Sequence, residues 1–161
     1  MGQSTNGIIS YGIQFEEGEG CPWEEAAEAA GFDDPWDDDY LAFALCGIEP
    51  FGDVEWGERG SPEYEAVRAR AGAYYDKKKA ALAGLGVEFL THCSGDYPMY
   101  MLVISESQQT ANRGYPQRIN PREMDMAENN GDWPARLRAV MEKLEIDGDK
   151  EMGWTLCSMW N

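Results

Sequence analysis

The only histidine of the chain, His92, stands next to Cys93. A cysteine–histidine catalytic pair needs the imidazole to face the sulfur, because the ring must take the thiol proton. Neighbouring residues of a strand point to opposite faces, which opposes this pairing unless the following turn reorients them. Cys46 or Cys157 could face His92 instead, and a purely structural role for the histidine is the simpler interpretation.

A second group with possible chemistry is basic and aromatic: Arg113, Tyr115 and Arg118. A guanidinium matches the geometry of a phosphate or carboxylate, so two arginines beside a tyrosine could hold an anionic ligand. Together with His92 and Asp96 at the turn before them, these residues form a ligand-binding hypothesis. The competing interpretation is that the arginines bridge to the acidic residues of the same chain.

Oxygen ligands for a hard cation could come from a run of aspartates, Asp33, Asp34, Asp37, Asp38 and Asp39. The run lacks the central glycine and the terminal glutamate of an EF-hand, and the four cysteines form no CxxC pair for zinc. Walker, GxGxxG, GxSxG and HExxH motifs are also missing from the sequence. We therefore predict a non-enzymatic protein without a metal site or cofactor.

Charge is distributed unevenly along the chain, which carries 30 acidic and 13 basic residues and a formal net charge of −17. Residues 1–60 hold 15 acidic residues and a single basic one, Arg59, whereas residues 61–161 hold 15 acidic and 12 basic residues. Such a negative field repels nucleic acids and anionic membranes and attracts basic protein surfaces. Simple solubility is the alternative explanation.

The acidic N-terminal third is the predicted partner-binding region. Its carboxylates could imitate the spaced phosphates of a duplex and occupy a basic groove built for DNA or RNA. Aromatic residues among them could serve as interface hot spots if exposed, or as ordinary core if buried. The predicted partner-binding residues are Glu24, Glu25, Glu28, Asp33, Asp34, Trp36, Asp37, Asp38, Asp39 and Trp56.

The elements that must position these residues include both strands and helices. Strands are predicted at 8–15, with a bulge or close backbone approach at Gly12, in a hairpin around the turn 94–98, and at 153–160. The unbroken apolar run 101–104 is typical of a strand covered on both faces. Early prolines, capping residues and the spacing of apolar residues predict helices at about 22–30, 36–45, 61–82 and 132–144. Residues 106–126 show little periodicity and are predicted to form a long loop.

This order of elements predicts an α+β fold with a small antiparallel or mixed sheet of about four strands, including the central hairpin, and helices packed on one face. The length favours one domain over residues 1–161, divided by charge into an acidic third, 1–60, and a near-neutral core, 61–161. We predict a monomer or small homo-oligomer with reduced cysteines and no membrane span.

Four blocks resemble one protein family: STNGIISYGIQFEEG near the start, THCSGDYPMYMLVIS in the middle, TANRGYPQRI after it and GWTLCSMW near the end. The family is a group of small, acidic proteins encoded by tailed bacteriophages. The resemblance implies a role in host takeover or against bacterial defence, including an anti-CRISPR role, in the host bacterial cytoplasm. The leading hypothesis is an inhibitor that binds the basic surface of a nucleic-acid-handling host or defence protein without binding nucleic acid itself. An anionic-ligand-binding protein or small enzyme, and an accessory of virion assembly, are the alternatives.

Overall fold

The computed structural model describes residues 5–15, 21–93 and 98–160. The chain divides into two compact units, which we call the sheet unit, residues 1–22 and 86–161, and the helical unit, residues 23–85. The change in charge after residue 60 therefore falls inside the helical unit and marks no structural boundary. A single domain over residues 1–161 stays a prediction.

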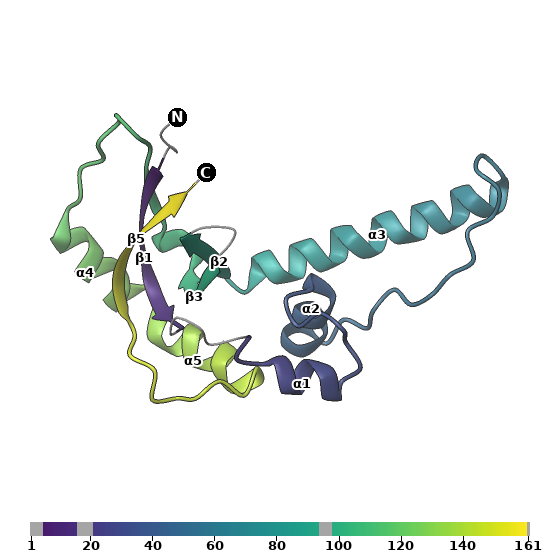
Figure 1. Cartoon of the computed structure of the whole chain (residues 1–161), viewed down its shortest axis with the longest axis horizontal. Coiled ribbons are helices and arrows are strands. Elements are labelled where there is room, and N and C mark those ends of the chain that lie inside the picture. The colour runs from purple at the N-terminus through teal and green to yellow at the C-terminus, as the bar shows by residue number, and fades with distance from the viewer. Residues whose placement is uncertain (1–4, 16–20, 94–97, 161) are drawn as a thin grey trace. The chain divides into compact units, whose positions relative to one another are not determined.

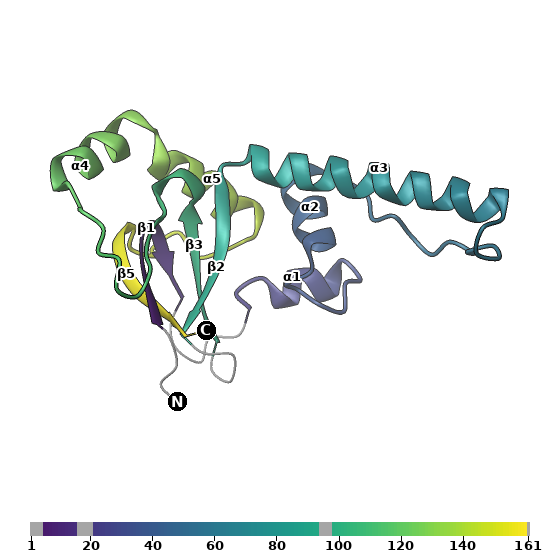
Figure 2. The same cartoon turned by 90° about the horizontal axis from the view of Figure 1, so that it is seen from above.

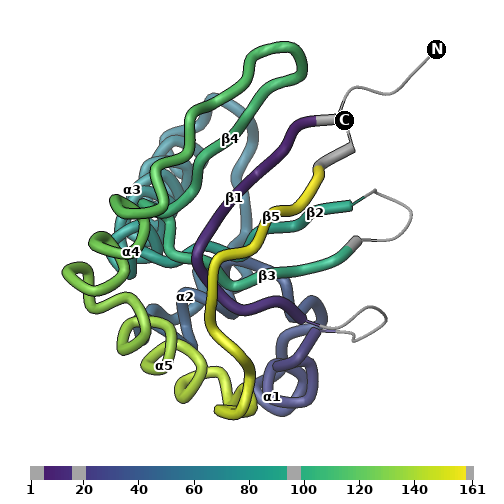
Figure 3. The backbone as a smooth tube through the Cα atoms, turned by 90° about the vertical axis from the view of Figure 1, so that its left-hand side faces the viewer, coloured from purple at the N-terminus to yellow at the C-terminus, as the bar shows by residue number. Residues whose placement is uncertain are grey.

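The sheet unit is built on five strands within the described residues: β1 (Thr5–Gln14), β2 (Val87–Cys93), β3 (Pro98–Ile104), β4 (Gln109–Ala111) and β5 (Gly153–Trp160). Their order is β3-β2-β5-β1-β4, and β1 additionally pairs with β3. Figure 3 shows β1 between β4 and β5. All pairings are antiparallel except one parallel residue pair between β2 and β5.

Strand β1 changes its partner along its length. Residues 7–9 pair with β4, residues 12–14 pair with β3, and β5 runs along the opposite edge. At the change of partner, a Cβ added to Gly12 would lie 2.1 Å from the carbonyl oxygen of Leu102. Only a glycine allows the two backbones to approach so closely, so the predicted close approach at Gly12 is confirmed.

A short 3₁₀ turn, η1 (Ser105–Ser107), carries the chain from β3 to β4 along the edge of β1. The amide of Tyr11 lies at this change of partner and donates to the hydroxyl of Ser107 at 2.9 Å. The same hydroxyl donates to the carbonyl of Ile104 at 2.6 Å. A buried serine side chain thus takes the place of a strand partner, because a buried backbone amide is costly to leave unpaired.

Two helices of the sheet unit, α4 (Pro121–Asn130) and α5 (Trp133–Lys143), meet the same face of the sheet. The hydroxyl of Tyr11 donates to Glu128 of α4 at 3.1 Å, and the Tyr11 ring lies 5.5 Å from the ring of Trp133 in α5. The predicted stripe of α5 is confirmed as core, since Leu137, Val140 and Met141 are buried together with Leu144 after it.

Both faces of β3 are covered, as its apolar run predicts. Residues 101–104 are all fully buried. Met101 and Val103 pack with Ile8 and Leu90 on one side, while the alternation of a strand turns Leu102 and Ile104 to the opposite side. The core of this unit is therefore formed by contacts between segments far apart in the sequence.

The helical unit contains α1 (Glu24–Ala29), α2 (Asp38–Cys46) and α3 (Pro62–Gly84), joined by chain without regular structure (Figures 1 and 2). Ser61 caps α3 by accepting from the amide of Tyr64, and Pro62 is its first residue, so the predicted start of this helix is confirmed. A cap of this kind satisfies an amide that has no partner within the helix.

One narrow stripe of α3 provides its packing surface. Tyr64, Val67, Ala71 and Tyr74 are half-buried or buried at helical spacing. The next position of this stripe is Lys78, which is only 8% exposed. The rings of Trp56 and Phe51, from the segment before α3, pack against Tyr64 and Tyr74.

The architecture is α+β, as the sequence predicts, with five strands in place of about four. The prediction of one long loop over 106–126 is wrong, because this segment contains η1, β4 and the start of α4. Asn120 caps α4 by accepting from the amide of Arg122 at 3.2 Å, and Pro121 follows it. None of the helices in the described part of the chain is both long and apolar enough to span a membrane.

Candidate functional site

The acidic residues before and within the first helices lie on the surface of the helical unit. Seven of the predicted partner-binding carboxylates are exposed: Glu24, Glu25, Glu28, Asp33, Asp34, Asp37 and Asp38. No ion pair among the described residues involves any of them. We call these seven residues the acidic surface. Its charge is open to a partner, because no lysine or arginine of the unit neutralises it.

Two members of the acidic surface also shape the backbone. Asp37 caps α2 by accepting from the amide of Asp39 at 2.8 Å, and Asp34 accepts from the amide of Trp36 at 2.9 Å. Both bonds use one carboxylate oxygen and bring no positive ion, so the negative charge remains. These two aspartates hold the segment before α2 in place and still contribute to its field.

Asp39 is a correction to the predicted set. Its carboxylate is only 27% exposed, forms an ion pair with Lys78 and accepts from the hydroxyl of Tyr74 at 2.8 Å. Burial alone would raise the pKa of Asp39, but the hydrogen bonds from Lys78 and Tyr74 lower it below its ordinary value of 3.8. Asp39 therefore joins α2 to α3 and does not belong to the acidic surface.

The aromatic residues of the acidic third divide between core and surface. Trp23 is buried and donates its indole N–H to the carbonyl of Pro35 at 2.7 Å, and Trp36 lies edge-on to it at 4.7 Å, half-buried. Trp56 is 52% exposed beside Tyr64. Of the two predicted aromatic contacts, Trp56 is thus the one whose ring is largely available to a partner.

The aspartate run that could supply oxygen ligands to a hard cation can be compared with the positions of its side chains in the structure. Within the described ranges, no three histidine, cysteine, aspartate or glutamate side chains gather closely enough to hold a metal ion. Asp39 points into the contact with Lys78, and the other four aspartates of the run are exposed. The aspartate run therefore acts as surface charge, as cap and as ion-pair partner.

His92 is buried in β2, with 8% of its surface exposed, and its Nε2 atom has no hydrogen-bond partner. It lies two residues from Leu90 and so shares the inner face of the sheet on which Cys157 also packs. Burial lowers the pKa of His92 and raises the pKa of the Cys157 thiol. Both groups favour their neutral forms, which opposes a thiolate–imidazolium pair and supports a structural histidine.

The ligand-binding residues of the sequence hypothesis do not converge. Arg113, Tyr115 and Arg118 are exposed in the segment between β4 and α4, and Tyr115 is 74% exposed. His92 lies within the sheet, and Asp96 falls outside the described residues. No ion pair in the described part of the chain ties Arg113 or Arg118 to an acidic residue. Arg118 lines a cavity of the sheet unit.

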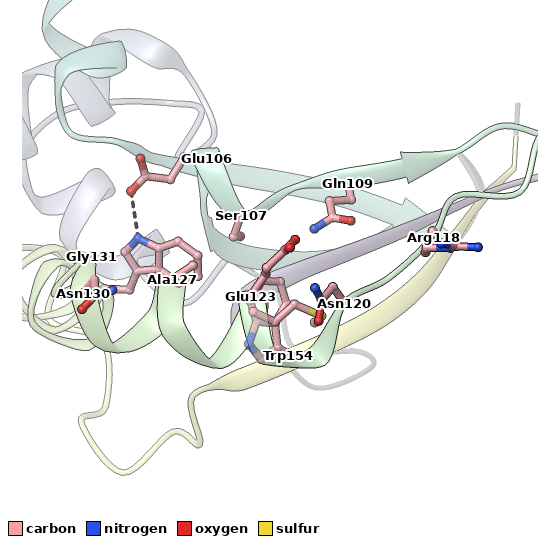
Figure 4. Close-up of a pocket in the computed structure, with 12 residues that line it drawn as sticks. Glu106, Ser107, Gln109, Arg118, Asn120, Glu123, Ala127, Asn130, Gly131 and Trp154 are labelled. Carbon is pink, nitrogen blue, oxygen red and sulfur yellow. Dashed lines mark hydrogen bonds between the residues drawn. The ribbon is translucent and has the colours of Figure 1, made fainter.

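That cavity, which we call the α4 cleft, has a volume of about 460 Å³ and lies in the sheet unit (Figure 4). Its floor consists of buried or half-buried residues: Ser107, Met124, Ala127, Gly131, Trp133 and Trp154. Its rim consists of exposed polar residues: Glu106, Gln109, Arg118, Asn120, Glu123 and Asn130. An aromatic floor with a polar rim is the usual composition of a small-molecule site.

Hydrogen bonds hold one wall of the α4 cleft in place. Glu106 accepts from the indole N–H of Trp133 at 2.8 Å, drawn as the dashed line in Figure 4. It also accepts from Arg136 at 2.7 Å, and a second nitrogen of Arg136 donates to the carbonyl of Gly86 at 2.8 Å. The bonds from Arg136 and Trp133 lower the pKa of Glu106, so this carboxylate is ionised at neutral pH.

Sequence reasoning missed the α4 cleft except for Arg118. The order Asn120, Pro121 and Glu123 combines a cap, a first-turn proline and an acidic residue in the first turn, a pattern that indicates a helix start. This pattern could have predicted α4 in place of part of the long loop, and with it one wall of the α4 cleft. Nothing local could have brought Trp154, from the last strand, to the same cavity.

No protein-family model, curated protein sequence or solved structure matches the chain.

Proposed function

We propose that this protein is an inhibitor that binds the basic surface of another protein through the acidic surface of its helical unit. The observation that carries the proposal is the set of seven exposed carboxylates between Glu24 and Asp38, none of which forms an ion pair with another described residue. Residues 23–58 contain twelve acidic residues and no basic residue. A field of one sign over such a stretch speeds association with an oppositely charged groove and selects against other partners.

The target class follows from what such a surface can replace. Proteins that bind nucleic acids neutralise the phosphates with lysine and arginine side chains, and spaced carboxylates can occupy the positions of those phosphates. The exposed ring of Trp56 supplies an apolar contact of the kind that dominates binding energy in interfaces. From the resemblance to tailed-phage proteins, we propose that the target is a nucleic-acid-handling protein of the host or of its defence system in the bacterial cytoplasm.

In the test, the purified chain is immobilised and used to capture proteins from a bacterial lysate. Duplex DNA or RNA oligonucleotides are then added to release captured proteins that bind nucleic acid at the same surface. A target that nucleic acid displaces agrees with the proposal. Its binding to the wild-type chain is then measured at several salt concentrations. Because exposed charges are screened by salt, we expect the affinity to fall steeply as the ionic strength rises.

Two matched variants then separate this surface from general acidity. The first neutralises the acidic surface with seven substitutions, E24Q, E25Q, E28Q, D33N, D34N, D37N and D38N. The second neutralises seven exposed acids of the sheet unit, D125N, D132N, E142Q, E145Q, D147N, D149N and E151Q, and so has the same net charge. Asparagine keeps the acceptors of Asp34 and Asp37, so the caps remain.

We expect the first variant to lose at least about tenfold in affinity for the displaced target and the second to lose little. Equal losses in both variants would mean that overall charge alone matters, and would overturn the proposal. Unchanged binding in the first variant, or a target that no nucleic acid displaces, would overturn it too.

A further inference from the structure

We propose that the α4 cleft binds a neutral carbohydrate about the size of a mono- or disaccharide. The inference is independent of the acidic surface, since every residue of the cleft belongs to the sheet unit. Its volume of about 460 Å³ falls inside the range of small-molecule sites. Three properties of the cleft limit the class of ligand: its apolar floor, its polar rim and its balance of charge.

The floor provides an apolar surface in a fixed position. The Trp154 ring lies edge-on to Tyr11 at 5.8 Å and to Trp133 at 5.7 Å. Such contacts between large rings hold each of them in one orientation. A sugar ring carries one face of C–H groups, which packs favourably against a half-buried aromatic ring and the neighbouring Met124 and Ala127.

The rim provides both donors and acceptors. Gln109 and Asn130 carry side-chain amides, each with a carbonyl acceptor and an NH₂ donor, Asn120 adds an NH₂ donor beside the carbonyl that caps α4, Arg118 donates, and the carboxyl group of Glu123 accepts. Hydroxyl groups both donate and accept, so a polyhydroxylated ligand can use every one of these groups. An apolar ligand would leave them without partners, which is costly once water is displaced.

The charge of the cleft disfavours an ionic ligand. The carboxylate of Glu106 is already paired with Arg136. Arg118 and Glu123 then remain as opposite charges, neither of them in an ion pair within the described residues. The attraction of an ion to one of these charges is offset by its repulsion from the other, so the rim gives neither an anion nor a cation a net advantage, and a neutral molecule fits it.

The framework of the cleft is largely preorganised. Arg136 and Trp133 fix Glu106, Ser107 is held by bonds to Tyr11 and Ile104, and Tyr11 is bonded to α4 through Glu128. A site that exists before binding loses little conformational entropy when the ligand enters. Only the exposed rim side chains must order.

The experiment titrates candidate ligands into the full chain and monitors binding by the backbone-amide NMR signals and by tryptophan fluorescence. The probes are glucose, galactose, mannose, N-acetylglucosamine, maltose and cellobiose, with glucose 6-phosphate and glucosamine as charged analogues and adenosine as a neutral ring compound. We expect saturable shifts at Gln109, Asn130 and Trp154 with at least one neutral sugar. Its charged analogue should bind more weakly.

The double substitution Q109A and N130A should weaken that binding at least about tenfold, because it removes two hydrogen-bonding amides. Gln14→Ala, which replaces an exposed residue of β1 outside the cleft, is the matched control and should bind as the wild type does. If the double variant is less stable, Arg118→Gln tests the same point from an exposed loop. Absence of binding to all six neutral sugars, tighter binding of a charged analogue or of adenosine, or unchanged affinity in the rim variants would overturn the inference.

Discussion

The two units carry almost the same net charge and use it differently. The helical unit has 15 acidic and 6 basic residues, a net charge of −9, and the sheet unit has 15 and 7, a net charge of −8. In the sheet unit, Glu106, Glu128 and Glu88 accept hydrogen bonds from side chains of other elements. In the helical unit, the acidic surface makes no such bond among the residues that the structure describes, and Asp39 joins α2 to α3.

The units also differ in how they are stabilised. The sheet unit has a close-packed interior in which β1 and β3 touch backbone to backbone. The helical unit buries apolar residues mainly in and around α1 and α2, and the stripe that α3 packs against them includes the ion pair of Lys78 with Asp39. Acidic residues of the sheet unit therefore both join its elements and lie on its surface, whereas the acidic surface of the helical unit contributes exposed charge. Substitutions in each unit test this difference.

The largest effect is expected at Gly12. In Gly12→Ala the new Cβ would lie 2.1 Å from the Leu102 carbonyl oxygen, so β1 and β3 must separate. We expect the free energy of unfolding of the sheet unit to fall by about 3 kcal/mol or more. Urea denaturation, with hydrogen exchange read separately in the two units, measures it.

Gly7→Ala is the matched control in the same strand, because no atom lies within 4 Å of its added Cβ. It should cost less than about 1 kcal/mol. Equal losses in the two variants would contradict the role assigned to the close approach at Gly12.

A smaller loss is expected at Lys78. Lys78→Met leaves Asp39 with Tyr74 as its remaining partner in a largely buried position. Breaking a buried ion pair costs several kcal/mol, and partial exposure of Asp39 reduces this to about 2 kcal/mol for the helical unit. Lys77→Met removes the same charge from an exposed neighbouring position and should leave stability unchanged. Thermal denaturation of the two variants at neutral pH gives the comparison.

The same ion pair should also appear in the pH dependence of stability. Because the pKa of Asp39 is lowered in the folded state, its contribution is present at neutral pH and is lost as the pH falls below the ordinary value of 3.8. The wild type should therefore lose more stability than Lys78→Met over this acid range. Parallel acid denaturation of both proteins would exclude the pair as a source of stability.

The smallest effect is expected at Tyr11. Burial and the bond to Glu128 raise its pKa to about 12, and Tyr11→Phe removes that bond at a cost of about 1 kcal/mol to the sheet unit. In the wild type, stability should fall as the pH rises above 10, because the unfolded tyrosine loses its proton first. Tyr75→Phe, at a position that is 56% exposed, should change neither result. Chemical denaturation across this alkaline range distinguishes the two variants.

Features that depend on local conformational preference can be predicted from the amino-acid sequence. A cap followed by proline marks the start of α3, the apolar run 101–104 marks a strand buried on both faces, and the spacing from Leu137 to Leu144 marks the buried side of α5. The uneven charge is likewise a property of composition. These features are predictable because each depends on residues a few positions apart, which helical or strand geometry places on known faces.

Tertiary contacts distinguish one residue from similar neighbours in the sequence. Among three consecutive lysines only Lys78 is buried, and among five neighbouring aspartates only Asp39 meets it, because the contact depends on how α2 and α3 pack. The α4 cleft joins Glu106, Asn130 and Trp154 through the packing of α4 and α5 on the sheet. Strand register and helix packing create such contacts between distant segments, and no local pattern encodes them.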